Sequence, residues 1–185
     1  MKRFLLGLLV FINLNGQLKN NNINECYDGQ TTDFQEFKKV YQNIVVDDYK
    51  KILTENNDQS QNEFEIILFE RGDNSKGSLA VFNVNGDQIF GYNKNITNVH
   101  YLNIKKEDIL ELTKNLAFIK NNFYGETCMK LQHNKINTLI IKKKGMIISG
   151  YVSYNSSKLK TSENSKDLIA LKKILSIVYQ NSFQK

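Results

Sequence analysis

The sequence of 185 residues contains no tryptophan and no proline, and it has only two histidines and two cysteines. It also lacks the common metal and nucleotide motifs, because HxH, HExxH, CxxC, GxxxxGK and GxGxxG do not occur. We therefore expect His100 and His133 to be ordinary surface or packing residues, and we predict no metal and no cofactor. With no tryptophan to stack on a sugar ring, carbohydrate chemistry is also disfavoured.

Long apolar runs are absent apart from Phe4–Ile12, which follows the basic residues Lys2 and Arg3. A bilayer-spanning helix needs about 20 apolar residues, so this run is too short to remain as a membrane anchor. A basic start, an apolar core and a small residue are typical of a secretory signal peptide, with cleavage expected after Gly16. The chain is then periplasmic or secreted. The alternative is a mobile apolar N-terminus or a buried first strand.

The composition is that of a folded domain with a modest basic excess. Hydrophobic residues make up 41% and aromatic residues 11% of the chain, and the formal net charge is +6. This excess is compatible with an acidic partner, but no basic stripe is visible and export argues against nucleic acid. Asparagine, lysine and isoleucine have AT-rich codons, and their abundance favours a low-GC bacterial source. We expect a signal peptide over 1–16, an extended polar leader over 17–32 and one domain over 33–185.

The two cysteines, Cys26 and Cys128, both remain after cleavage of the signal peptide. An even number of cysteines in an oxidising compartment favours a disulfide. A bridge closing a loop of about 100 residues would stabilise the fold by up to about 4.7 kcal/mol in the chain-entropy model. The alternatives are two buried thiols, or Cys128 as a nucleophile.

Hydrophobic periodicity predicts the elements of the first half. Asp33 and Glu36 have the spacing of a capping box, and the apolar residues after them predict a helix over 33–54. The pair Asn85-Gly86 indicates a type I′ hairpin. The expected strands are residues 63–71, 79–84, 88–92 and 99–104.

In the second half, apolar residues spaced by 3, 4, 3 and 4 run from Ile109 to Phe123 and predict a helix that begins near Lys105. A final helix is expected after Ser165, and residues 156–164 are expected to form a loop. The expected strands are residues 127–132, 138–141 and 146–154, the last two joined as a hairpin.

Together these elements predict an α+β fold. We expect a largely antiparallel sheet of five to seven strands, since hairpins dominate the connections, with three helices packed on one face. The order of the strands remains open.

Three acidic residues, Glu63, Glu65 and Glu70, lie close together with Asp73 nearby. In a strand, Glu63 and Glu65 would share a face, so their carboxyl groups could act as a pair in glycoside chemistry. An acidic pair on a solvated face or edge is the simpler interpretation.

Cys128 and His133 lie five residues apart, with Glu126 available to orient the histidine. Such a pair can generate a nucleophilic thiolate, but a disulfide to Cys26 would remove the nucleophile. We therefore predict no catalytic residue at this position.

The densest basic cluster is Lys142, Lys143 and Lys144, followed by Gly145. It is a possible interaction patch for phosphate groups or cell-wall polymer. A hairpin turn kept soluble by lysines explains the same residues without a ligand.

The leading hypothesis is a small exported bacterial protein that is not catalytic. It would bind another protein or an envelope component, as an inhibitor or an immunity-type module. The alternatives are a small periplasmic or secreted hydrolase acting on cell-wall or protein substrate, and a carrier with an apolar ligand between sheet and helices.

Overall fold

The structure of the chain is a computed structural model. It describes residues 26–44, 61–72, 77–95, 98–128, 135–153, 159–161 and 165–183. The expected signal peptide over 1–16, Asp73 and His133 lie outside these ranges.

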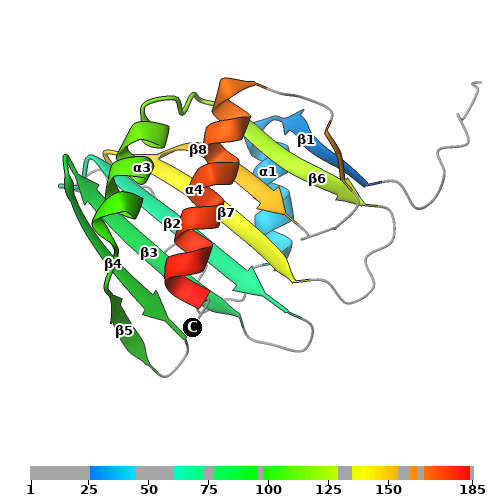
Figure 1. Ribbon diagram of the computed structural model, residues 1–185. Coiled ribbons are helices and arrows are strands. Elements are labelled where there is room, and N and C mark those ends of the chain that lie inside the picture. The colour runs from blue at the N-terminus through cyan, green and yellow to red at the C-terminus, as the bar shows by residue number, and fades with distance from the viewer. Residues whose placement is uncertain are drawn as a thin grey trace, which may run out of the picture.

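The described residues form a single nine-stranded sheet in the order β5-β4-β3-β2-β7-β8-β6-β1-β9 (Figure 1). Its strands are β1 (Cys26–Thr32), β2 (Phe64–Arg71), β3 (Ser78–Asn85), β4 (Gln88–Lys94), β5 (Val99–Leu102), β6 (Phe123–Cys128), β7 (Ile136–Lys143), β8 (Met146–Ser153) and β9 (Leu159–Thr161). Most neighbouring strands are antiparallel, whereas β6 with β8 and β1 with β9 are parallel. The predicted α+β class is confirmed, but the sheet is mixed and has more strands than the expected five to seven.

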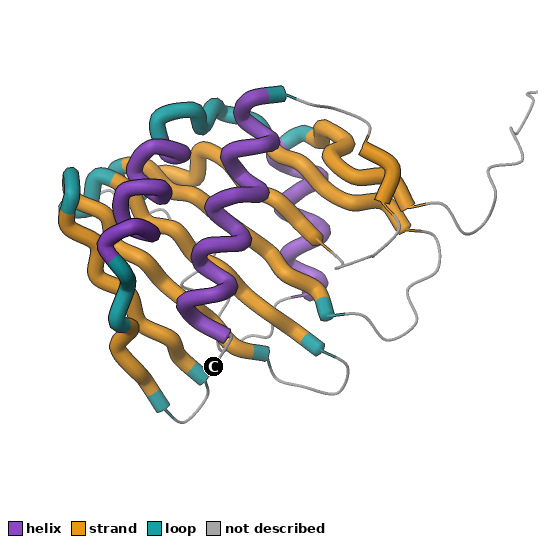
Figure 2. The backbone as a smooth tube through the Cα atoms, in the orientation of Figure 1, coloured by secondary structure: helices purple, strands orange, loops and turns teal. Residues whose placement is uncertain are grey.

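Three described helices cover the sheet: α1 (Phe34–Ile44), α3 (Lys106–Leu116) and α4 (Lys166–Phe183). In Figures 1 and 2, α3 and α4 lie side by side over one face, and α1 lies behind the sheet. Leu112 and Leu171 pack into the core on the α3 and α4 side, whereas Phe37 of α1 packs into the other core. The expectation that all helices group on one face is therefore wrong. None of the described helices is long and apolar enough to cross a membrane.

Alternation along the central strands supplies both cores. In β2, Ile66 and Leu68 face α3 and α4, and Ile67 and Phe69 face the α1 side; all four are fully buried. A strand buried on both faces reads as a continuous apolar run, which is why residues 66–69 do not alternate with polar residues. The prediction of a central strand at this position is confirmed.

Both predicted hairpins form, but the turn of the first differs from the expected type. Between β3 and β4 only Gly86 has a positive φ, of 58°, so Asn85 does not adopt the left-handed geometry that a type I′ turn centred on Asn85-Gly86 requires. Between β7 and β8, Lys144 and Gly145 both have positive φ, of 49° and 80°. The second hairpin thus has the φ pattern of a type I′ turn.

Several element boundaries differ from the sequence prediction. The first helix is described to Ile44, and the rest of the predicted range lies outside the described residues. The predicted helix after Lys105 ends at Leu116, and Phe123 begins β6 instead of completing the helical seam. Part of the expected polar leader forms β1, and part of the loop expected over 156–164 forms β9.

The N-terminal end of α4 is held to the sheet by a buried carboxylate. Asp167, only 2% exposed, accepts hydrogen bonds from the Lys120 backbone N–H at 3.0 Å, Asn122 Nδ2 at 2.9 Å and the Tyr124 hydroxyl at 3.1 Å. Ser165 Oγ accepts from the Leu168 backbone N–H at 3.2 Å, as expected of an N-cap. These bonds fix the helix over β6.

Candidate functional site

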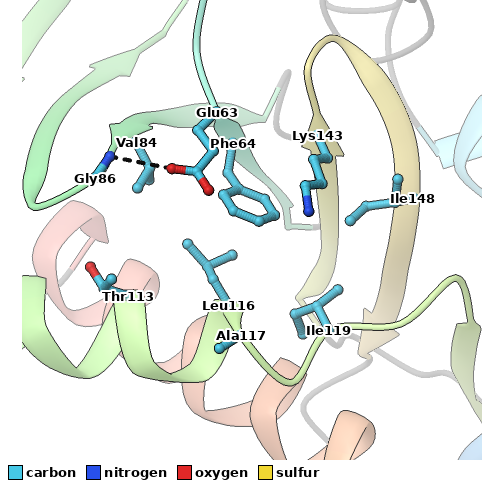
Figure 3. A pocket seen from close by; sticks show the side chains of 10 residues that line it. All are labelled: Glu63, Phe64, Val84, Gly86, Thr113, Leu116, Ala117, Ile119, Lys143 and Ile148. Carbon is cyan, nitrogen blue, oxygen red and sulfur yellow. Dashed lines mark hydrogen bonds between the residues drawn. The ribbon is translucent and has the colours of Figure 1, made fainter.

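A pocket of about 320 Å³ lies between α3 and the ends of β2, β3 and β7 (Figure 3). Its floor is apolar and includes Phe64, Val84, Leu116, Ile119 and Ile148. Thr113, Ala117 and Gly86 line its edges, together with Glu63 and Lys143. The pocket therefore combines an apolar floor with one acidic and one basic side chain.

Two hairpin turns hold Glu63 in place just before β2. The Glu63 backbone N–H donates to Asn85 Oδ1 at 2.9 Å, and the Glu63 carbonyl accepts from the Lys144 backbone N–H at 3.1 Å. Asn62 bonds to the side chains of both Asn83 and Asn85, at 2.9 and 3.1 Å. Hydrogen bonds to Asn83 and Asn85 thus attach Asn62 and Glu63 to the β3–β4 hairpin.

Lys143 enters the pocket from the neighbouring strand. The β2–β7 register places Lys143 directly opposite Phe64, and Lys143 Nζ lies 5.2 Å from the centre of the Phe64 ring. At this distance the ammonium is attracted to the face of the ring. Figure 3 shows the Glu63 carboxylate and the Lys143 ammonium on either side of that ring.

The structure separates the two glutamates that the sequence analysis treated as a pair. Glu63 lines the α3-side pocket, whereas Glu65 lies on the opposite face, with Lys142 Nζ 3.7 Å from its Oε1. Burial and the nearby Glu65 carboxylate raise the pKa of Tyr92, which packs on that face. The shared face required for a two-carboxylate glycosidase is therefore not present.

The same alternation divides the lysine cluster. Lys142 is only 3% exposed, and it faces Glu65 on the α1 side of the sheet. Lys143 is exposed at the α3-side pocket, and Lys144 is exposed in the turn. The three lysines do not form one continuous surface, although Lys143 remains available to a ligand.

Cys26 and Cys128 are directly opposite each other in the antiparallel pair of β1 and β6. Glu126, two residues before Cys128, is buried, and its Oε1 accepts from the Tyr151 hydroxyl at 3.1 Å and Ser153 Oγ at 2.8 Å. The Glu126 carboxylate thus links β6 to two side chains of β8.

The remaining sequence-predicted residues occupy ordinary positions. His100 is exposed in β5. Glu70 Oε1 lies 3.2 Å from Lys135 Nζ, and the hydrogen bond and charge of Glu70 raise the pKa of Lys135. In the described part of the chain, no three histidine, cysteine, aspartate or glutamate side chains are grouped to hold a metal ion.

An exposed apolar patch at the β4–β5 end of the sheet was not predicted from the sequence. Phe90, Val99 and Tyr101 are 65%, 51% and 88% exposed. The register places Phe90 opposite Asn83, and places Tyr101 opposite Tyr92, which packs with the α1-side core. All three therefore project from the face opposite α3 and α4, where no described helix covers β4 or β5. In the sequence, apolar residues at every second position of the two strands were the available sign of an apolar face.

The pocket was missed for a different reason, because Leu116 and Ile119 belong to the apolar seam that predicted only core packing.

No protein-family model, curated protein or solved structure matches this chain.

Proposed function

We propose that this chain is an exported protein that binds another protein through the β4–β5 end of its sheet. The observation that carries the proposal is the exposed patch of Phe90, Val99 and Tyr101. Contiguous exposed apolar groups on an otherwise well-packed domain mark interaction surfaces. Aromatic residues are also enriched at the energetic centres of protein interfaces.

The position of β5 supports a particular mode of binding. β5 is the last strand at one end of the sheet, so one of its edges has no partner strand among the described residues. Its four residues, from Val99 to Leu102, include no charged residue and no proline, which are the usual protections of an edge strand. We propose that an extended segment of the partner pairs with β5 while Phe90 and Tyr101 provide apolar contacts.

Export is supported by the position of the two cysteines. Directly opposed residues of antiparallel strands have Cα atoms about 4.5–5.5 Å apart, and disulfides span Cα separations of about 4.4–6.8 Å. The pairing of Cys26 with Cys128 therefore suits a disulfide, which persists in an oxidising compartment. We propose that residues 1–16 are a signal peptide and that the bridge forms after export to the periplasm or medium.

Capture of the partner tests the binding proposal. The mature protein and its F90S/Y101S variant are each used, in separate experiments, to pull down partners from envelope extracts of the host. Leu110→Ser is the matched control, because Leu110 is 57% exposed on α3, which covers the opposite face of the sheet from the patch. We expect one protein to be retained by the wild type and by L110S and lost by F90S/Y101S. Equal retention by all three proteins would contradict the proposal.

A mass measurement on protein purified from the host tests export separately. We expect an N-terminus at Gln17 and no remaining Met1–Gly16 segment. An intact segment in the purified protein would rule out cleavage.

We do not propose the hydrolase, because Glu63 and Glu65 lie on opposite faces of the sheet and Cys128 lies opposite Cys26.

A further inference from the structure

The α3-side pocket contains two opposite charges that are not paired with each other. Within the described residues, the Glu63 carboxylate accepts a hydrogen bond from the Gly86 backbone N–H, at 3.4 Å, and forms no ion pair. Lys143 likewise contacts the Phe64 ring and no described carboxylate. The neighbouring charged residues Glu65 and Lys142 behave differently, because they pair with each other on the other face. The pocket therefore offers one carboxylate and one ammonium to a ligand.

The apolar floor between these charges is well defined. Val84 and Leu116 are buried core residues, and Ile119 and Ile148 are half-buried against them. The volume of about 320 Å³ lies at the small end of the range of about 300–1,000 Å³ that is typical of ligand pockets. The site thus has room for one small molecule with an apolar body.

We infer that this pocket binds a free α-amino acid with an apolar side chain. The ligand ammonium would meet Glu63, the ligand carboxylate would meet Lys143, and the side chain would cover Phe64 and the apolar floor. A ligand with one charge would satisfy only one of the two protein groups. A zwitterion satisfies both Glu63 and Lys143. Its net charge is zero, and so is the summed charge of these two side chains.

Hydrogen bonds and strand pairing within the chain hold the charged residues of the pocket in place. Bonds from Asn85 and Lys144 hold the Glu63 backbone, and Lys143 is fixed by its position opposite Phe64 in the β2–β7 register. Binding therefore needs little ordering of the chain, which favours affinity for a small ligand. The pocket lies on the α3 side and the β4–β5 patch on the opposite face, so this inference does not depend on the proposed partner.

Isothermal titration calorimetry with three related ligands tests the inference. L-Phenylalanine carries both charges, 3-phenylpropanoate lacks the ammonium, and phenethylamine lacks the carboxylate. We expect saturable binding of L-phenylalanine, and binding of each analogue weaker by about fivefold or more. Similar affinity for all three ligands would overturn the inference, and so would the absence of binding at the solubility limit of L-phenylalanine.

Three variants locate the site. Glu63→Gln and Lys143→Gln should each weaken L-phenylalanine binding by about fivefold or more, since each removes one charge. Lys106→Gln removes an exposed charge at the start of α3 that does not line the pocket, so it should bind like the wild type. Backbone amide NMR spectra confirm that each variant is folded, and the L-phenylalanine shifts should centre on Thr113 and Ala117. Shifts elsewhere, or equal weakening in K106Q, would overturn the assignment.

Discussion

Replacing Gly150 by alanine should push α1 away from the sheet. A Cβ built at Gly150 directly contacts Phe37 Cζ and lies 2.6 and 2.9 Å from two other carbons of that ring. Carbon atoms in contact are normally about 3.5–4.0 Å apart. Phe37 is 1% exposed and packs against Phe123 with ring centres 5.1 Å apart, so its ring has little room to move. We expect a loss of about 1–3 kcal/mol in the free energy of unfolding, as for other overpacked cores.

Denaturant unfolding measures this loss, and a fall of about 2–12 °C in Tm should accompany it for a chain of this size. Gly125→Ala is the matched control, because a Cβ at Gly125 meets no atom within 4 Å and the residue also lies in a strand. In a Phe37→Ala background, which itself should cost about 3–5 kcal/mol, Gly150→Ala should lose most of its effect. If Gly150→Ala were as harmless as Gly125→Ala in the wild type, the placement of α1 against β8 would be refuted.

Three further predictions concern Asp167, the two cysteines and Tyr92. Asp167→Ala should lower the free energy of unfolding by about 2–4 kcal/mol, measured by denaturant unfolding, because the Lys120 N–H loses its buried acceptor. Denatured but unreduced protein from the oxidising compartment should take up no iodoacetamide, and mass spectrometry should show two adducts after reduction of Cys26 and Cys128; adducts before reduction would show free thiols. The pKa of Tyr92 is raised, so as the pH rises the folded state keeps its phenolic proton after the unfolded state has lost it. The contribution of this proton to the free energy of unfolding is therefore present below about pH 10 and is lost as the pH rises further. Tyr92→Phe should reduce this loss in urea titrations, and ultraviolet titration should show one fewer late-ionising tyrosine.

Sequence periodicity predicted the hairpins and α4, because each depends on neighbouring residues. It did not predict the placement of α1. The spacing of Phe34 and Phe37 shows that this helix has an apolar face, but both faces of the central strands are apolar. The choice of face depends on a close approach to Gly150, more than one hundred residues away in the chain. A glycine within a mostly apolar strand was the one local sign that a backbone or ring comes near.

The end of α3 shows a different limit. The spacing from Ile109 to Phe123 fits a single helix, yet the chain leaves the helix after Leu116. The Phe118 and Ile119 backbone N–H groups donate to carbonyls three residues earlier, at 3.0 and 3.2 Å, so the helix tightens as it ends. Phe123 then packs on the α1 side of the sheet instead of with Leu116. An apolar residue can satisfy a helical period and still belong to a strand, because both cores accept it.

The positions of the two charged side chains in the pocket depend on contacts between segments that are far apart in the sequence. Glu63 and Glu65 were expected to share a face, but β2 begins at Phe64, and hydrogen bonds to the two hairpin turns direct Glu63 toward the α3 side. Lysine is rarely buried unless it is paired, and Lys142 is paired because the β2–β7 register places it opposite Glu65. A shift of this register by one residue would bring Lys143 to the buried face and remove the ammonium from the pocket. The ligand site thus follows from the pairing of β2 with β7, which is why the sequence could identify its residues as charged but not as neighbours.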